Sequence, residues 1–295
     1  MAFAKINGTD LFYVGTGCGV PCLVMHGGLG VDHTQFREWL DPLGDVLHLI
    51  YYDHRGNGRS GRPPIETLTL DQLVADADAL RAHLGYQQIA VIGHSYGGCL
   101  ALLYALRHPQ RVSHLLLVGT TAAWDYFDEL ALEVQRRGVD TEVVSALVNL
   151  PATDAQMAHD QLAIAPLAFH PHNVHLAARV LGGTIWNAAA NVRSRQLASL
   201  FNVRSRLRHI SAPTLVLAGR EDFFCPPAQA ARLRAGIPGS RLVIFERSGH
   251  YPFAEEAPAF QDAVRTWLQA LSEPQREHLK SIEIDEWSRA RYDAN

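Results

Sequence analysis

Short, continuously apolar runs recur along the chain and are separated by segments with helical periodicity. The apolar runs occupy residues 22–25, 46–52, 89–92, 114–118, 214–218 and 242–245. Unbroken runs of this kind are typical of strands that are covered on both faces of a parallel sheet. Amphipathic segments lie at residues 71–84, 95–107, 228–235 and 257–271. Strands and helices in alternation predict a doubly wound α/β fold, with a mostly parallel twisted sheet flanked by helices.

One long stretch interrupts this alternation. From residue 120 to about 211 the sequence has no run that reads as a buried strand, only helical patterns broken by Pro151, Pro166 and Pro171. A segment of this length is too long for a plain loop in a compact domain. We therefore expect a helical cap inserted between two strands, above their carboxyl ends. The predicted parts are a core at 1–120 and 212–272, a cap at 121–211, and a polar C-terminal extension at 273–295.

Composition narrows the function classes. The chain has 295 residues, 47% of them hydrophobic and 19% charged, with a formal net charge of −4. This balance is globular and gives no basis for a nucleic-acid or membrane partner. Four scattered cysteines form no disulfide framework, and no apolar run reaches the length of a signal core or a membrane span. We expect a cytoplasmic protein that acts on a small molecule. The sequence leaves its oligomeric state open, including a homo-oligomer.

The most informative motif is "VIGHSYGG" at residues 91–98, where an apolar run meets a helical segment. A Gly-x-Ser-x-Gly at such a junction is the context of a nucleophile elbow, in which a strained turn exposes the serine hydroxyl. The small residues Gly93 and Gly97 would let strand and helix pass closely. The alternative is that Ser95 is an ordinary helix N-cap, a common use of serine.

A serine nucleophile needs a base, and the base needs an orienting acid. Asp222 follows the apolar run at 214–218, and His250 follows the next run at 242–245. Asp222 and His250 could each be a simple loop residue instead. However, chance would rarely place a serine, an acid and a histidine in this order, each at the end of a predicted strand. Glu221 is the competing acid, and the spacing from Gly219 favours Asp222.

To about residue 272 the chain resembles the α/β-hydrolase superfamily, in which the triad occurs in the order serine, acid, histidine. "HGGLG" at 26–30, "DHRGNGRS" at 53–60 and "GHSYGG" at 93–98 resemble the proline iminopeptidase-like branch. The resemblance implies that the N–H groups of Gly28 and Tyr96 form an oxyanion hole. It also implies that His26 and residues 53–55 hold loops together rather than perform chemistry.

Two features depart from the peptidase pattern. Leu29 replaces the usual proline, and His94 before the serine is a pairing familiar from esterase-like relatives. In addition, residues 161–220 contain seven arginines and no Asp or Glu. An aminopeptidase must hold a substrate ammonium with carboxylates. The cap residues left for that task are these four aspartates: Asp125, Asp128, Asp154 and Asp160.

The remaining candidates are a pocket and a metal site. Side chains proposed for the substrate pocket are Leu29, His94, Trp124, Phe127 and Trp186. The segment "FHPHNVH" offers His170, His172 and His175, but no carboxylate or cysteine lies near it in sequence, so no metal is expected. A serine triad generates its own nucleophile, so no cofactor is expected either.

Together these features predict a serine hydrolase that cleaves a small carboxylic ester or lactone through an acyl-enzyme, with Ser95, Asp222 and His250 as the triad. The first alternative is an aminopeptidase of the proline iminopeptidase type. The second is a ligand-binding protein or lyase on the same fold, because a fold does not determine a function.

Overall fold

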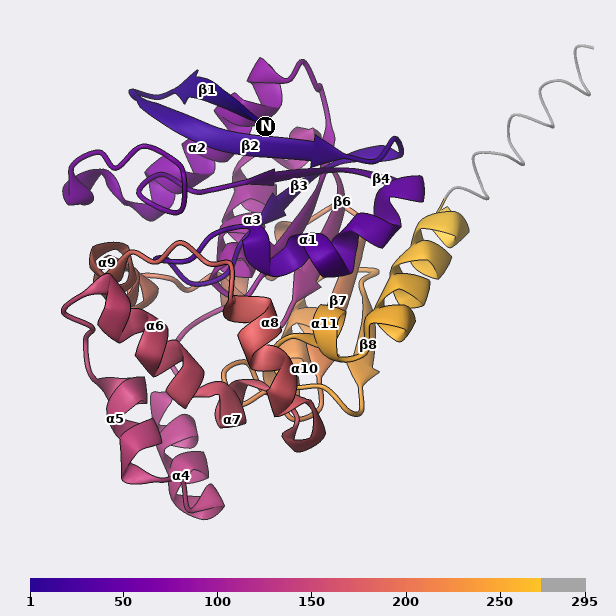
Figure 1. Ribbon diagram of the computed structural model, residues 1–295. Coiled ribbons are helices and arrows are strands. Elements are labelled where there is room, and N and C mark those ends of the chain that lie inside the picture. Colours follow the sequence, from indigo (N-terminus) through magenta and orange to yellow (C-terminus); the bar gives the residue numbers. More distant parts are fainter. Residues whose placement is uncertain (272–295) are drawn as a thin grey trace, which may run out of the picture.

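A computed structural model describes residues 1–271, and an eight-stranded sheet lies at its centre (Figure 1). The strand order is β1-β2-β4-β3-β5-β6-β7-β8. The six strands from β4 to β8 in this spatial order are all parallel to one another. The strands are β1 (Ala2–Ile6), β2 (Thr9–Thr16), β3 (Val20–Met25), β4 (Leu47–Tyr52), β5 (Ile89–His94), β6 (Val112–Val118), β7 (Thr214–Gly219) and β8 (Arg241–Phe245). The α/β prediction with a mostly parallel sheet is confirmed. The predicted extension at 273–295 lies outside the described residues.

The sheet begins with an antiparallel hairpin that the apolar runs did not predict. β1 and β2 pair in register from Ala2 opposite Tyr13 to Ile6 opposite Thr9, and β2 also pairs antiparallel with β4. The turn uses Asn7 at φ 46° and Gly8 at φ 80°. An Asn-Gly pair between alternating residues is the strongest short-range hairpin signal, because both positions need a positive φ.

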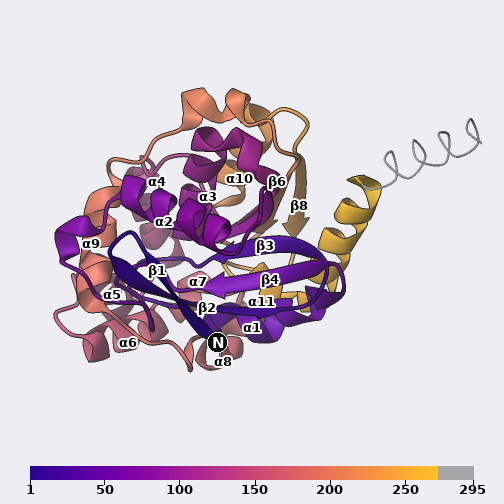
Figure 2. The ribbon, with the colours of Figure 1, turned by 90° about the horizontal axis from the view of Figure 1, so that it is seen from above.

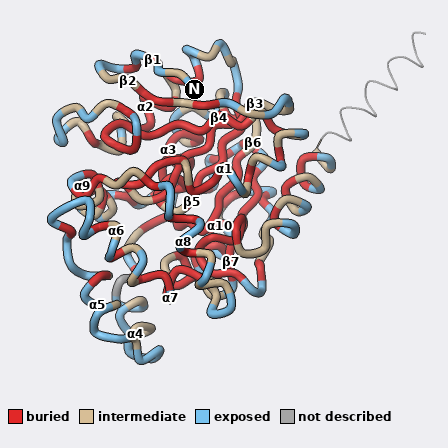
Figure 3. Tube along the Cα trace, in the orientation of Figure 1, coloured by how far each residue is buried: buried red, intermediate tan, exposed pale blue. Residues whose placement is uncertain are grey.

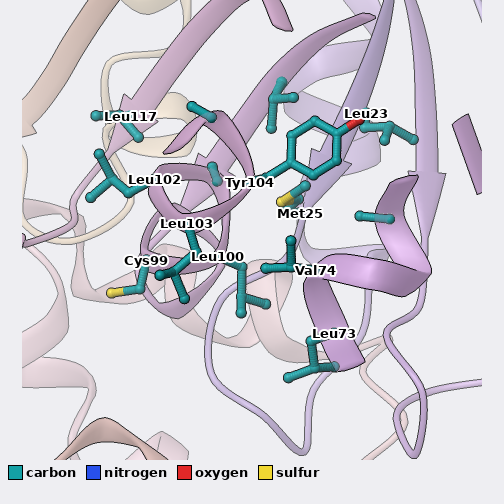
Figure 4. Close-up of a cluster of buried hydrophobic side chains, with 14 of the residues drawn as sticks. Leu23, Met25, Leu73, Val74, Cys99, Leu100, Leu102, Leu103, Tyr104 and Leu117 are labelled. Atoms are coloured by element: carbon teal, nitrogen blue, oxygen red, sulfur yellow. The ribbon is translucent and has the colours of Figure 1, made fainter. Parts of the chain in front are cut away.

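Helices cover both faces of the sheet (Figure 2). One face carries α2 (Leu70–His83), α3 (Tyr96–Arg107) and α10 (Pro227–Gly236); the other carries α1 (Thr34–Leu40) and a helix at 257–271. Within β5, Val91 belongs to the core on the first face, while Ala90 and Ile92 belong to the core on the second. This explains why the strands read as unbroken apolar runs. Figure 4 shows part of the first core, between α2, α3 and the sheet.

The chain between β6 and β7 forms further helices that lie together on one side of the molecule (Figure 1). They are α4 (Phe127–Arg137), α5 (Thr141–Val148), α6 (Asp154–Ala163), α7 (Ala165–Ala168), α8 (Ala177–Leu181) and α9 (Ala188–Ala198). The two ends of this segment meet in an antiparallel bridge between Ala123 and Asn202. Two further contacts join the ends: Val203 N donates to Ala122 O at 2.8 Å, and Arg204 pairs with Asp125.

Burial differs sharply between the two regions. The central strands β3 to β7 are mostly buried, whereas α4 and α5 consist mainly of exposed and intermediate residues (Figure 3). α11 (Pro252–Glu255) is a single buried turn after β8, between the sheet and the helices that follow β6. Within residues 1–271, no helix has the length and apolar character needed to cross a bilayer.

Candidate active site

Ser95 lies in a strained turn between β5 and α3. Its backbone has φ 54° and ψ −118°, which is costly for a residue with a side chain and persists only when the surroundings enforce it. Hydrogen bonds enforce it here: Ser95 N donates to Val118 O at 2.9 Å, and Thr120 Oγ1 donates to Ser95 O at 2.6 Å. Ser95 occupies the N-cap position of α3, but its side chain makes no capping hydrogen bond, so the hydroxyl is not used as a cap.

Glycines next to Ser95 make this turn possible. A Cβ at Gly97 would lie 2.1 Å from Met25 O, and one at Gly93 would lie 2.5 Å from Gly97 O. A Cβ at Gly98, which the sequence analysis did not single out, would collide with the Thr120 side chain at 2.5 Å. Backbone atoms cannot move aside as a flexible side chain can, so β3, β5 and α3 approach this closely only with glycine at 93 and 97.

Asp222 and His250 form a buried pair next to this turn. His250 Nδ1 lies 2.9 Å from Asp222 Oδ2 and 3.0 Å from Oδ1, and Cys225 N donates to Oδ1 at 2.9 Å. Because the carboxylate accepts, Nδ1 carries the proton and Nε2 is left as the basic nitrogen. His250 N donates to Ala168 O at 2.6 Å, which attaches the histidine loop to α7.

The adjacent acid, Glu221, has a different environment. Its carboxylate lies 3.7 Å from Arg137 Nη2 and its side chain is 43% exposed, while that of Asp222 is fully buried. Gly119 leaves room for the Asp222–His250 pair, because a Cβ there would lie 3.2 Å from both Asp222 Oδ2 and His250 Nδ1. The geometry therefore selects Asp222 as the partner of the histidine.

Ser95 and His250 line one cavity of about 170 Å³. Its polar lining includes the amides of Gln35, Gln161 and Asn191, which the sequence analysis did not predict. Such neutral groups carry no motif and come together only through the fold. Apolar side chains make up much of the remaining wall, among them Val31, Met157, Ile164, Phe169, Leu181 and Phe224.

None of the described residues that line this cavity is an Asp or Glu. Three of the four cap aspartates have partners elsewhere: Asp125 pairs with Arg204, and Asp154 Oδ1 accepts from Ala188 N at 2.8 Å. Asp160 Oδ1 accepts from Gln156 Nε2 at 2.6 Å, and Asp128 is exposed on α4. The cavity thus presents neutral hydrogen-bonding groups and no fixed negative charge from a carboxylate.

The other predicted site residues fall into three groups. Gly28, His94 and Trp124 line the cavity, and Tyr96 is the first residue of α3, directly after Ser95. Leu29 and Trp186 are not on the cavity wall: Leu29 is fully buried in the core, and Trp186 packs beside Val31, Met157 and Ala188. The prediction for Phe127, at the start of α4, concerns a side chain outside those that the structure describes.

His94 stabilises the loop that carries His250. Its Nε2 donates to His250 O at 2.9 Å, and the two ring centroids are 4.7 Å apart. Burial, with a smaller effect from the neighbouring His250, lowers the pKa of His94 well below its usual value. A neutral His94 is therefore a donor to the loop and not a second base.

Glu255 on α11 is a second support that the sequence analysis missed. Its carboxylate accepts from Gly249 N at 2.9 Å and Tyr251 N at 3.2 Å, the residues on either side of His250. It also accepts from His170 N at 2.7 Å, in the chain between β6 and β7. Burial raises the pKa of Glu255 to about 7. The one feature of the sequence that could have indicated this role for Glu255 is its position, five residues after His250.

The described side chains that could together hold a metal ion are not those of the histidine run at 170–175. Among the described residues, the group of potential metal ligands consists of Asp222, Cys225 and His250, and the run from His170 to His175 is not part of it. Burial raises the pKa of the Cys225 thiol well above its usual value. A protonated thiol is a poor metal ligand, so this group is better described as the Asp–His pair with a thiol beside it.

Two residues of the motif at 53–60 have structural partners. Asp53 accepts from His33 Nδ1 at 2.6 Å and from Arg59 N at 2.8 Å. Arg55 forms a buried two-pronged ion pair with Asp76 on α2, at 2.5 and 2.7 Å. Neither side chain lines the cavity. These contacts hold the loop after β4 in place.

Comparison with known proteins places this site in a family. A model described as alpha/beta hydrolase fold matches residues 21–257, and the chain belongs to that family. It is 27% identical to proline iminopeptidase PfmaB of Pestalotiopsis fici (90% of this chain, 99% of the relative) and 27% identical to putative carbamate hydrolase RutD of Rhizobium rhizogenes (85% and 94%). An esterase structure from Thermogutta terrifontis superposes with a TM-score of 0.75 at 25% identity, covering 92% of this chain and 99% of that one.

These comparisons identify the protein as a member of a hydrolase family, and they do not distinguish ester hydrolysis from peptide hydrolysis. A hydrolase family that includes esterases and peptidases supports an enzyme, and the nucleophile elbow and oxyanion hole are typical of the fold.

Proposed function

We propose that this protein is a serine hydrolase that cleaves a small, neutral or anionic carboxylic ester or lactone. One observation carries the choice of substrate: the cavity that contains Ser95 and His250 has amides on its wall and no carboxylate among its described lining residues. Binding a substrate ammonium in such a cavity would bury a cation without an anionic partner, which is expensive. A neutral ester or lactone requires only hydrogen bonds.

In the proposed mechanism Ser95 Oγ attacks the substrate carbonyl while His250 Nε2 takes the hydroxyl proton. Asp222 keeps the other histidine proton on Nδ1 and stabilises the imidazolium that forms. The N–H groups of Gly28 and Tyr96 bind the developing oxyanion, and each such donor is worth about 2.7–4 kcal/mol. His250 then protonates the leaving alcohol, and water activated by the same nitrogen releases the acid from Ser95.

The second candidate is an aminopeptidase, and the likeness to proline iminopeptidases favours it. A comparison of kcat/KM for p-nitrophenyl acetate and prolyl p-nitroanilide separates the two. We expect the ester to win by far more than its greater intrinsic reactivity. Efficient turnover of the anilide, lost when Asp125, Asp128, Asp154 or Asp160 is made neutral, would support the peptidase instead.

The nucleophile is tested independently of the substrate. An active-site phosphonate should add once to the protein, as seen by intact mass, and should not add to Ser95→Ala. Labelling that survives this substitution would remove Ser95 from the mechanism. A well-folded protein that is not labelled and hydrolyses no substrate would favour a ligand-binding role.

A further inference from the structure

A second, larger cavity lies next to the catalytic one. It has a volume of about 930 Å³ and lies between α4, α5 and the loop that follows β7. Apolar side chains dominate its wall, and these are Trp124, Leu130, Ala131, Val134, Val139, Val144, Leu147, Val148, Phe223 and Phe224. We call it the α4–α5 groove. No residue of α4 whose side chain is described is buried, and in α5 only Ala146 is, so this apolar surface lacks a covering partner among the described residues.

The groove shares a wall with the catalytic cavity. Trp124 and Phe224 line both spaces. The Phe224 ring centroid lies 5.3 Å from that of His250, so the shared wall stands directly beside the proposed base. A substrate chain that passed between Trp124 and Phe224 would reach the α4–α5 groove.

Size indicates that a substrate would use both spaces. Pockets for small molecules usually measure about 300–1,000 Å³, and the catalytic cavity of about 170 Å³ is smaller than that. It suits the reacting carbonyl and a short group on one side. The larger remainder of a substrate would fit the groove.

The one cation on the groove wall is already used, among the residues that the structure describes. Arg195 donates from Nη1 to Leu147 O at 3.2 Å and Val148 O at 3.3 Å, at the C-terminal end of α5. The other polar side chain on the wall is the amide of Gln135. A charged ligand group would therefore find little to bind there, whereas an aliphatic chain would.

We infer that the α4–α5 groove binds an extended apolar chain of the substrate, which makes the preferred substrate a medium-chain ester rather than an acetate. This inference rests on the proposed function and adds the class of chain that the enzyme accepts. The chain belongs either to the acyl group or to the alcohol, and the two are separated by experiment.

The test measures kcat/KM for two series, p-nitrophenyl acetate, butanoate and octanoate on the acyl side, and ethyl, butyl and octyl acetate on the alcohol side. We expect kcat/KM to rise in one series by up to about fourfold for each methylene that is buried. No rise in either series, with acetate hydrolysis intact and dependent on Ser95, would overturn the inference and leave the proposed function standing.

A matched pair of variants on α4 locates the effect. Val134 lines the groove, whereas Leu132 is 65% exposed and does not. Val134→Asp should reduce kcat/KM for the longest ester by at least tenfold more than for the acetate, and Leu132→Asp should leave both unchanged. Equal losses for long and short esters in Val134→Asp would contradict the inference. So would a change of oligomeric mass without a change in chain preference, which would mean that a second copy covers the groove.

A binding measurement separates failure of the groove from failure of the proposed function. Calorimetry with octanol should show binding to the wild type and to Leu132→Asp, and at least tenfold weaker binding to Val134→Asp. Binding of this kind in a protein that hydrolyses no ester would support the groove and contradict the proposed reaction. Absence of octanol binding in an active esterase would overturn the groove.

Discussion

At the residue scale, two adjacent acids show how burial distinguishes a catalytic partner from a surface charge. Asp222 Oδ2 lies 2.9 Å from His250 Nδ1 and Oδ1 accepts from Cys225 N at 2.9 Å, while Glu221 extends toward Arg137. Two neighbouring residues thus carry carboxylates in different environments, one buried and hydrogen-bonded and the other half-exposed. Only the first can hold the imidazole in one tautomer.

This contrast leads to a prediction with its own control. Asp222→Asn should lower kcat by about 10⁴-fold, because the amide stabilises the wrong tautomer of His250. Glu221→Gln should change kcat little. Steady-state kinetics with circular dichroism as a check of folding would decide, and a larger loss in Glu221→Gln would mean that the acid is misassigned.

The three proposed catalytic residues could be selected from the sequence, because Ser95, Asp222 and His250 each follow a strand that is a clear apolar run. The residues of the cavity wall could not. Gln161 and Asn191 lie on different helices with no motif around them, and they meet only through the packing of α6 and α9. Trp186 looked like a pocket aromatic and instead packs beside Met157.

At the scale of elements, the turn α11 connects the histidine loop to the chain that covers the cavity. Glu255 accepts N–H groups from both sides of His250 and from His170. Glu255 therefore helps to position the proposed base relative to that covering chain, together with the bond from His250 N to Ala168 O. Its pKa of about 7 makes its charge variable near neutral pH.

A prediction for stability follows from this pKa. The pKa of Glu255 rises on folding from 4.5 to about 7, so the folded state binds a proton that the unfolded chain releases. Its contribution is present below pH 4.5 and is lost as the pH rises to about 7. The free energy of unfolding of the wild type relative to Glu255→Gln should fall over that window by up to about 3 kcal/mol. Urea denaturation of both proteins at several pH values measures this difference, and a flat difference would contradict it.

Elements were predicted unevenly, for a physical reason. Strands buried on both faces are continuous apolar runs and were found with small shifts at their ends, as in β3 and β6. β1 and β2 form the edge of the sheet and alternate, so that criterion passed over them despite the Asn7-Gly8 turn. The short α1 was missed as well, because seven residues hold too few turns for a periodic pattern.

At the scale of the whole molecule, three buried histidines set the response to acid. Burial lowers the pKa values of His26, His54 and His94 below their usual value of 6.5. For His26 the geometry agrees, because its Nε2 accepts from His54 N at 3.0 Å and cannot take a proton without breaking that bond. The folded protein keeps these rings neutral.

We therefore expect the protein to lose stability as the pH falls below about 6.5, the value at which the histidines of the unfolded chain take up protons. Each ring contributes up to about 1.4 kcal/mol per pH unit, and the three together exceed the opposite contribution of Glu255. Urea midpoints between pH 7.5 and pH 5 should fall accordingly. In His94→Gln the slope should be smaller by about one proton, and an unchanged slope would exclude His94 from the effect.

The bridge between Ala123 and Asn202 has a consequence for how such a protein diversifies. The ends of the segment that carries α4 to α9 are already joined, by that bridge and by the Asp125–Arg204 pair. Changes of length or sequence inside a loop with closed ends need not disturb the strands on either side, and the entropy of closing a longer loop grows slowly. Evolution, or a designer, could exchange the helices between the two ends and inherit the same strained serine and acid, provided that the contacts of the histidine loop with Ala168 and His170 were rebuilt. Substrate range and catalytic chemistry would then be separately heritable parts of one chain.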